Sequence, residues 1–460
     1  MSLERLPSSF RDPSGFLFRH QGALHRFVAS SYAPHYDTLM RGGLYQELTA
    51  AELLLPHEET SLEDADTRGA HRTIIPEPLP FVSYPYEWCF SELKAAALCT
   101  LEIQMRALAR GMILKDASAY NIQFRRGRPV LIDTLSFEVY REGAPWIAYR
   151  QFCEHFLAPL LLMARVHPDA GRLLREYLEG VPLEIAARLL GGGALLSPAA
   201  LIHVWLHARS IRRHADTTTA SRGALRMSRG GLTALIDSLA SAVRGLDWRP
   251  AGTPWADYER THGYRGETLE AKRALVRDRI SASRPATVWD LGANTGDLSR
   301  VAASTGAAVI AWDADPAAVE LNYRRVVSEQ EPGVLPLVMD LTNPSPALGW
   351  NHGERMSLAE RGPADALLAL ALVHHLAIGH NLPFELIAEG FARLGKLLIV
   401  EYVPKDDPQA QRLLRSREDV FTCYSRQAFE EAFGRHFRVT ASDRLPGSGR
   451  VLYVMQRQGA

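Results

Sequence analysis

The chain has 460 residues, which is too long for one ordinary hydrophobic core, so we expect two or three domains. Hydrophobic residues make up 47% and charged residues 23%, a composition typical of globular proteins that excludes a disordered chain. Lysine plus arginine and aspartate plus glutamate number 52 each, so no net charge draws the protein to nucleic acid or to an acidic membrane.

The cysteines and the apolar runs predict the cellular compartment. Four cysteines are scattered along the chain without a C-x-x-C pair, which favours a reducing cytoplasm. The first residues contain no apolar signal core, and the longest apolar stretches, at 157–164 and 364–376, fall short of the roughly 20 residues that a membrane span requires. Arginine, alanine and leucine dominate, as in GC-rich bacterial genomes. We therefore expect a cytoplasmic bacterial protein without a membrane partner.

The first 250 residues divide by pattern into two parts. Residues 15–90 show short alternating runs broken by proline, glycine and acidic turns, which predict a small β-rich lobe at 1–90 with a helix near 44–55. Helical periodicity then dominates, which predicts a helical lobe at 91–250. The stretch WRPAGTPWADY at 248–258 is the best linker candidate, because it is rich in proline and glycine.

A phosphotransferase-like pattern lies in this first half. Asp116 and Asn121 are five residues apart, and Asp133 ends a short predicted strand 12 residues later. Phosphoryl transfer needs a base for the hydroxyl group and oxygen ligands for magnesium, and protein kinases draw them from this order of residues. Residues 91–137 resemble the catalytic core of protein kinase-like and aminoglycoside phosphotransferase-like folds. The resemblance implies an α+β domain with two lobes, and Mg/ATP as ligands only if the domain is active.

Other parts of the kinase pattern are missing. No glycine-rich phosphate loop is visible, and residues 1–93 contain no lysine to hold the phosphates. Arg26, on a predicted strand, is a candidate substitute, although a guanidinium is not equivalent to a lysine ammonium. We therefore interpret Asp116, Asn121 and Asp133 as a phosphotransferase remnant in a degenerate domain that recognises a substrate or partner. The alternative is that the domain is an active phosphotransferase.

Strand-like and helical runs alternate in the last part of the chain, which we assign to a domain at 251–460. Near-continuous apolar strands separated by amphipathic helices predict a parallel sheet covered on both faces. Two final strands joined by a Pro-Gly-Ser-Gly turn add an antiparallel hairpin. The expected fold is therefore α/β, with a Rossmann-like sheet of seven strands whose runs lie at 287–291, 309–313, 336–340, 364–372, 396–402, 437–443 and 450–456.

The first of these strands ends in a glycine turn with the sequence DLGANTG. Asp290 ends the strand, and Gly292, Asn294 and Gly296 build a tight turn, since glycine and asparagine tolerate positive φ. A dinucleotide site requires G-x-G-x-x-G, whereas here the sixth position is Asp297. Two carboxylates beside the turn disfavour a pyrophosphate and suit a cationic ligand.

Two further aspartates follow at the ends of the next strands. Asp313 lies 23 residues after Asp290, where a carboxylate can accept hydrogen bonds from both hydroxyls of a ribose. Asp340 ends the third strand and is placed to accept from an adenine amino group. Each aspartate alone is an ordinary turn former. Together, at successive strand ends after a glycine turn, they indicate a nucleoside site.

With these motifs, residues 251–455 resemble the class I S-adenosylmethionine-dependent methyltransferase family. The resemblance implies S-adenosyl-L-methionine as the cofactor and assigns the methionine end to the turn residues Asp290, Gly292, Asn294 and Gly296. It places Asp313 on the ribose and Asp340 near the adenine. The approach sequence PWADYERTHGY at 254–264, followed by Lys272, also resembles the lead-in of some family members, so Tyr264 is a further candidate to line the site.

The fourth strand delivers His374 and His375 toward the expected reaction centre. A histidine suits a base at neutral pH, and methyl transfer to a hydroxyl or amine often requires one. The alternative is that one histidine packs under the sheet while the other lines the pocket. Glu401 and Tyr402, at the end of the fifth strand, are further pocket candidates.

The nature of the acceptor stays open at this stage. The strand exit lacks the Asn/Asp-Pro-Pro-Tyr/Phe signature, which argues against DNA-adenine or glutamine methylation. A small molecule, a glycan or a peptide remains, and the sequence does not indicate an oligomeric state. His203, His207 and His214 have helical spacing, but we interpret them as a solvated helical face and predict no metal site. Two rival hypotheses are a bifunctional kinase and methyltransferase, and a regulatory protein that binds the cofactor without catalysis.

Overall fold

The computed structural model describes residues 4–60, 69–191, 202–204, 226–250, 266–415, 420 and 423–459. They form two compact units. Unit 1 comprises Met1–Arg249 together with Leu348–Arg355, and unit 2 comprises Pro250–Ala347 and Met356–Ala460.

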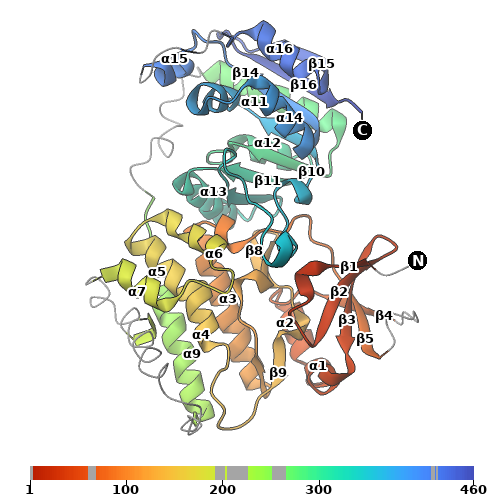
Figure 1. Cartoon of the computed structure of the whole chain (residues 1–460), viewed down its shortest axis with the longest axis vertical. Helices are drawn as coiled ribbons and strands as arrows, with labels where there is room; N and C mark the ends of the chain where they lie inside the picture. Colours follow the sequence, from red (N-terminus) through yellow and green to blue (C-terminus); the bar gives the residue numbers. More distant parts are fainter. Residues whose placement is uncertain are drawn as a thin grey trace. The chain divides into compact units, whose positions relative to one another are not determined.

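Unit 2 contains the predicted seven-stranded sheet, with strand order β12-β11-β10-β13-β14-β16-β15. Figure 1 labels β10, β11, β14, β15 and β16 of this sheet. The first five strands in this order pair in parallel, and the two C-terminal strands pair antiparallel, as the sequence predicts. The strands are β10 (Thr287–Leu291), β11 (Ala308–Asp313), β12 (Val334–Val338), β13 (Ala364–Ala369), β14 (Gly395–Tyr402), β15 (Phe437–Arg444) and β16 (Val451–Arg457).

Helices cover both faces of this sheet. The central strands are therefore buried on both sides, which explains why they are apolar at nearly every position. On one face, Val276 and Ile280 of α11 pack with α12 and α13 against Val288 and Ala366 in one core cluster. On the other, α16 places Phe429 near Tyr453, with ring centroids 5.3 Å apart. The helices are α11 (Gly266–Ser283), α12 (Asp297–Ala303), α13 (Pro316–Glu329), α14 (Phe384–Leu394), α15 (Pro408–Leu414) and α16 (Arg426–Gly434).

Two strands end more than one residue before their sequence-based bounds. β12 stops at Val338, two residues before Asp340, and β13 stops at Ala369 rather than at residue 372. The second difference has a backbone cause, because Ala371 adopts φ +52°, a left-handed conformation that cannot continue a strand.

Unit 1 combines an antiparallel sheet with a helical part. The sheet has the order β1-β2-β3-β5-β4 and is built from β1 (Glu4–Arg5), β2 (Gly15–His20), β3 (Ala23–Ala29), β4 (His57–Thr60) and β5 (Ala70–Pro76). Two short helices, α1 (Ala33–Arg41) and α2 (Leu44–Ala50), interrupt it. A small core joins Val28 and Ile74 of the sheet to Tyr32 and Tyr36. The predicted kinase-like character of this unit stays a prediction.

The rest of unit 1 is mainly helical and contains two small β-ladders. The longest helix, α3 (Phe90–Ala109), packs against α9 (Arg229–Arg244). The ladders pair β6 with β9 and β7 with β8. The remaining elements are β6 (Met112–Leu114), β7 (Ile122–Arg125), β8 (Arg128–Leu131), β9 (Phe137–Val139), α4 (Tyr149–Phe152), α5 (Ala158–Arg165), α6 (Leu173–Glu176) and α7 (Leu183–Leu190).

The segment Leu348–Arg355 belongs to unit 1 although it lies between β12 and β13 in the sequence. Arg11 donates two hydrogen bonds of 2.8 Å to the two carboxylate oxygens of Glu354, whose side chain is 5% exposed. The guanidinium of Arg355 lies 4.3 Å from the ring centroid of Tyr120. A paired buried carboxylate and a cation–π contact together anchor this segment.

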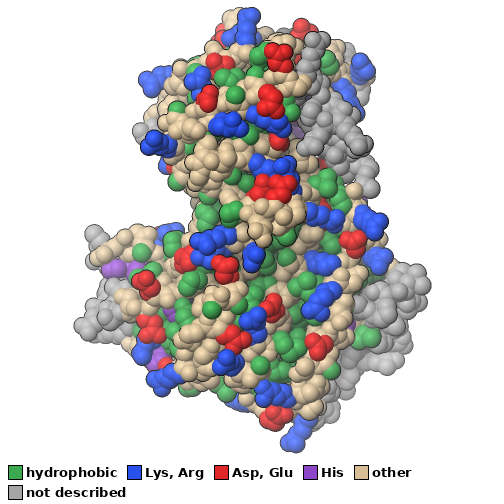
Figure 2. All heavy atoms as spheres, turned by 180° about the vertical axis from the view of Figure 1, so that it is seen from behind, with side chains coloured by type: hydrophobic (Ala, Val, Ile, Leu, Met, Phe, Trp, Pro, Cys, Tyr) green, Lys and Arg blue, Asp and Glu red, His purple; other side chains and the backbone are tan. Residues whose placement is uncertain are grey.

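Charged side chains of both signs are interspersed over the face shown in Figure 2. None of the helices in the described part of the chain is both long and apolar enough to cross a membrane.

Candidate functional site

A glycine turn connects β10 to α12 in unit 2. Gly292, Asn294 and Gly296 have φ values of +77°, +51° and +82°, which confirms the left-handed turn predicted for these positions. The backbone N–H groups of Gly292 and Ala293 both donate to the carbonyl of Trp312 on β11 at 2.8 Å. A Cβ at Gly296 would lie 2.5 Å from the amide of the buried Asn322, and φ +82° is a conformation that other residues rarely adopt, so glycine is strongly favoured at this point of the turn.

The turn forms one wall of a cavity of about 460 Å³ within unit 2. Leu370 and Ala371, which follow the adjacent strand β13, form another wall. The cavity therefore lies at the carboxyl ends of two neighbouring parallel strands, where ligands bind in sheets of this type. Its lining residues are Leu269, Lys272, Arg273, Asp290, Gly292, Ala293, Asn294, Thr295, Asp297, Leu298, Arg325, Leu370 and Ala371.

Asp290 provides a buried carboxylate in the wall of this cavity. The residue is 3% exposed, and its Oδ2 accepts a hydrogen bond of 2.6 Å from the hydroxyl of Ser299. Burial raises the pKa of Asp290 to about 6, although the Ser299 hydroxyl and the nearby Lys272 act in the opposite direction. A carboxylate held in this way gains from a cationic ligand, because the ligand charge offsets its lost hydration.

A cation also lies in the cavity wall. Lys272, on α11, contributes an ammonium whose Nζ lies 2.6 Å from Glu401 Oε2. Arg450 bonds the other oxygen of Glu401 at 3.2 Å and Asp407 at 2.7 Å. These four side chains are at most 8% exposed, so two positive and two negative charges balance one another inside the protein.

This cationic side of the site was not predicted. The sequence indicates that Asp297 is a carboxylate that disfavours a pyrophosphate, whereas in the structure Asp297 pairs with Arg273 of α11 at 2.7 Å. Of the fifth-strand candidates, Glu401 is fully buried in the ion cluster and Tyr402 is 4% exposed, and neither is among the residues that line the cavity. Tyr264 lies outside the described residues.

Asp313 lies at the end of β11 and is hydrogen-bonded to the glycine turn. Its Oδ2 accepts from the Asn294 backbone N–H at 2.8 Å, and its Oδ1 accepts from that of Asp315 at 2.9 Å. The side chain is half-buried, and desolvation raises the pKa of Asp313 to about 6. The backbone N–H of Ala314 is a third donor to this carboxylate, whose two oxygens offer four lone pairs, so the carboxylate as a whole retains capacity for a further donor.

Asp340 is engaged in a local turn after β12. Its Oδ1 accepts from the Thr342 backbone N–H at 2.8 Å and from the Thr342 hydroxyl at 2.6 Å. The structure thus gives Asp340 a turn-forming role, and its predicted contact with adenine stays a prediction.

The two candidate histidines differ in exposure. His374 is completely buried, and neither of its ring nitrogens has a hydrogen-bond partner in the described part of the chain. His375 is half-buried and lies beside it, with ring centroids 4.1 Å apart. Burial lowers the pKa of His375 to about 4 and also lowers that of His374, so both rings are neutral at pH 7. Of the two, only His375 has exposed surface with which to reach an acceptor.

In unit 1, the structure brings two of the three phosphotransferase-like residues together. Asn121 Nδ2 donates to Ser136 Oγ at 3.3 Å, and that hydroxyl donates to Asp133 Oδ2 at 2.8 Å. Asp116 instead accepts a hydrogen bond of 2.8 Å from Gln151. No group of three or more metal-ligating His, Cys, Asp or Glu side chains occurs among the residues that the structure describes.

The prediction that the helical histidines lie on a solvated face is wrong for His203. His203 is 2% exposed rather than solvated, and its ring nitrogens lie 2.8 Å from the Tyr149 hydroxyl and 3.2 Å from the Ser238 hydroxyl. His207 and His214 lie outside the described residues.

Comparison with solved structures finds methyltransferases. The bifunctional kinase-methyltransferase WbdD matches with 16% identity and a TM-score of 0.30, covering 45% of this chain and 42% of its own. The magnesium protoporphyrin IX methyltransferase ChlM of Synechocystis PCC 6803, solved with bound SAH, matches with 15% identity and a TM-score of 0.31, covering 44% of this chain and 92% of its own. This chain thus spans less than half the length of WbdD. The strand order of unit 2 remains the basis of its fold assignment.

Sequence comparison gives a full-length relative. No family model matches the chain. The nodulation protein NoeA of Rhizobium meliloti (strain 1021) is 36% identical over 460 residues, which cover 98% of this chain and 96% of that protein. At this identity over nearly the whole length, the chain belongs to the family of the nodulation protein NoeA.

Proposed function

We propose that unit 2 is a class I methyltransferase that uses S-adenosyl-L-methionine. The observation that carries the proposal is the buried carboxylate of Asp290 in the wall of a cavity that the glycine turn borders at the carboxyl ends of β10 and β13. When bound, the cofactor supplies a methyl group activated by a sulfonium.

The residues of the cavity fit the methionine end of this cofactor. Asp290 would accept hydrogen bonds from its ammonium group, and the cations Lys272 and Arg273 suit its carboxylate. Gly292 and Asn294 line the same cavity, where a turn with positive φ brings the backbone close to a ligand.

For the nucleoside, Asp313 is the candidate partner of the ribose, since its carboxylate keeps capacity for a further donor. We retain Asp340 as the candidate for the adenine and Gly296 as the residue that shapes the turn.

His375 is the preferred candidate for the base that takes a proton from the acceptor. It keeps exposed surface, whereas His374 is fully buried. A base of this kind suits a hydroxyl or amine acceptor on a small molecule, a glycan or a peptide. The name of the NoeA relative states a process, nodulation, and no substrate.

Calorimetric titration of the full-length protein with S-adenosylhomocysteine tests the cofactor assignment. We expect saturable binding by the wild type and a large loss in Asp290→Asn and Asp313→Ala. Asp365→Asn is the matched control, because Asp365 lies at the amino end of β13 and pairs with Lys396 at 2.8 Å. Equal binding by all four proteins, or tighter binding of NAD than of S-adenosylhomocysteine, would refute the proposal.

The acceptor is sought by incubating the protein with cell extract and labelled S-adenosyl-L-methionine. We expect a labelled product that is absent with Asp290→Asn. Cofactor binding without any labelled product would favour a regulatory protein over an enzyme.

A further inference from the structure

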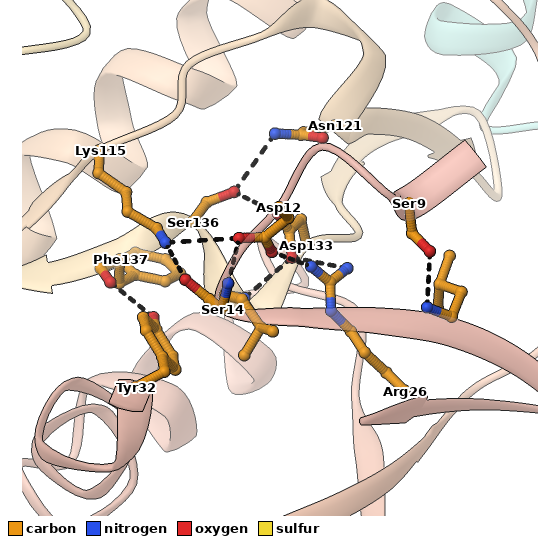
Figure 3. A network of polar contacts seen from close by, with 12 residues as sticks. Ser9, Asp12, Ser14, Arg26, Tyr32, Lys115, Asn121, Asp133, Ser136 and Phe137 are labelled. Atoms are coloured by element: carbon orange, nitrogen blue, oxygen red, sulfur yellow. Dashed lines mark hydrogen bonds and ion pairs between the residues drawn. The ribbon is translucent and has the colours of Figure 1, made fainter. Parts of the chain in front are cut away.

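Unit 1 contains a cluster of charged side chains centred on Arg26 of β3 (Figure 3). The Nη1 atom of Arg26 lies 2.9 Å from Asp133 Oδ1, and its Nη2 lies 2.7 Å from Asp12 Oδ2. The side chains of Arg26 and Asp133 are each 12% exposed, and that of Asp12 is 24% exposed. A single guanidinium therefore bridges two partly buried carboxylates that are 121 residues apart in the sequence.

The other contacts of Asp133 come from its own chain segment. Oδ1 also accepts the backbone N–H of Leu135 at 2.9 Å, and Oδ2 accepts the hydroxyl of Ser136 at 2.8 Å. Both carboxylate oxygens thus already accept hydrogen bonds, one of them from a permanently charged donor.

A second cation completes the cluster. Lys115 Nζ lies 3.8 Å from Asp12 Oδ1, donates to Ser14 Oγ at 2.5 Å, and lies 4.8 Å from the ring centroid of Tyr32. Two cations and two carboxylates balance the charge of the cluster without an added ion, which Figure 3 shows as one connected set of contacts.

This arrangement does not fit the Mg/ATP ligands that the kinase-like resemblance implies. Mg²⁺ requires oxygen ligands at about 2.0–2.1 Å in near-octahedral geometry. A cation bound by Asp133 would stand close to the guanidinium of Arg26, and like charges at short range repel strongly where water is partly excluded. Asp116 is held by Gln151 and is not a member of the cluster.

We propose that Arg26 takes the place of a divalent cation between Asp12 and Asp133, so that unit 1 is a metal-independent recognition module and transfers no phosphoryl group from Mg/ATP. The inference is independent of the methyltransferase proposal, because every residue of the cluster lies in unit 1. It disfavours the bifunctional enzyme and leaves recognition of a substrate or partner as the role of this half.

The first test asks whether removing the built-in cation creates a metal site. Full-length wild type, Arg26→Ala and Arg26→Ala/Asp133→Asn are titrated with Mn²⁺, whose free ion is measured by electron paramagnetic resonance. We expect Arg26→Ala to bind Mn²⁺ at least tenfold more tightly than the wild type, and the added Asp133→Asn to abolish the gain. Arg19→Ala is the matched control, since Arg19 is an exposed arginine of the neighbouring strand β2.

The second test asks whether the charge of Arg26 is what the cluster needs. We expect Arg26→Ala to lower the melting temperature, and Asp12→Asn plus Asp133→Asn in the same protein to restore much of the loss, because no unbalanced carboxylate then remains. A role in packing alone predicts that the losses add. This triple variant also provides a folded protein if Arg26→Ala alone does not fold.

Four results would overturn the proposal. One is Mg²⁺-dependent ATP turnover by the wild type that disappears in Asp133→Asn. Another is Mn²⁺ binding by the wild type that depends on Asp133. The third is a folded Arg26→Ala protein that gains no Mn²⁺ binding. The fourth is a triple variant that is no more stable than Arg26→Ala.

Discussion

Replacing Asp290 by asparagine should remove cofactor binding and at the same time stabilise unit 2. Asparagine keeps the shape of the side chain and can still accept the hydrogen bond from Ser299, but it carries no charge. The buried carboxylate of Asp290 has a pKa raised to about 6 by desolvation, which means that its ionised form disfavours the folded state. The buried negative charge that would bind a cationic ligand therefore destabilises the folded protein when no ligand is bound.

The magnitude follows from proton linkage. With an unfolded-state pKa near 3.9, a folded-state value of about 6 destabilises the ionised protein by at most ~3 kcal/mol. Between these two pKa values the folded state binds more protons than the unfolded state, so the free energy of unfolding falls as pH rises and is lowest above pH 6. An unpaired amide donor in the variant offsets about 1–2 kcal/mol of the gain. For a unit of this size, the remaining 1–2 kcal/mol correspond to roughly 2–8 °C.

Differential scanning calorimetry at pH 8 and pH 4.5, with and without S-adenosylhomocysteine, measures both effects. At pH 8 we expect Asp290→Asn to melt above the wild type, and at pH 4.5 we expect the difference to shrink. The ligand should raise the melting temperature of the wild type and of the Asp365→Asn control, but not that of Asp290→Asn. If Asp290→Asn melts below the wild type at pH 8 while binding the ligand normally, the reasoning about this carboxylate is wrong.

Three further outcomes are expected. The affinity for S-adenosylhomocysteine should fall as pH drops below 6, by up to about tenfold per pH unit, because protonated Asp290 no longer attracts an ammonium; titration at several pH values measures this. Gly296→Ala, which combines a positive φ with a Cβ only 2.5 Å from its nearest neighbours, should destabilise unit 2 by ~2 kcal/mol or more in urea unfolding, whereas Gly390→Ala in the open face of α14 should stabilise it by ~1 kcal/mol. Lys272→Met should cost ~3–5 kcal/mol by leaving Glu401 with an incomplete set of partners, and adding Glu401→Gln should restore part of that loss.

The strands of unit 2 could be predicted because the signals for each strand lie in its own residues and in the turns beside it. Each is a short apolar run ended by an aspartate or a turn, and each occurs in the structure within a few residues of its predicted bounds. The glycine turn was equally accessible, since the positive φ at Asn294 and at the two glycines follows from residue type alone. The end of β13 was not, because the left-handed conformation of Ala371 has no sequence signal.

Helix α11 and the cations it contributes were missed for a specific reason. The buried positions of α11 are Thr268, Lys272, Val276 and Ile280, spaced four residues apart, so a polar residue and a charged one interrupt the apolar stripe by which an amphipathic helix is usually recognised. Lys272 is buried there because Glu401, 129 residues later, neutralises it. The two partners are too far apart in the sequence for a local pattern to show that they pair.

The same limit applies to unit 1. The sequence shows Asp133 and offers Arg26 as a possible substitute for a phosphate-binding lysine. Only the structure shows that Arg26 bonds Asp133 itself and that Asp12 supplies the second carboxylate. Arg26, which the sequence suggests as a ligand-binding residue, therefore binds two carboxylates of its own chain.

Leu348–Arg355 belongs to unit 1, although the residues on both sides of it belong to unit 2, and this affects how the two units can be expressed separately. A gene cut near codon 250 yields two fragments, and the downstream one carries Glu354 without Arg11, and Arg355 without the ring of Tyr120. The upstream fragment loses part of its own folded body. To produce the downstream half alone, this loop should be replaced by a short linker. Alternatively, both halves can be co-expressed, so that the loop binds to unit 1.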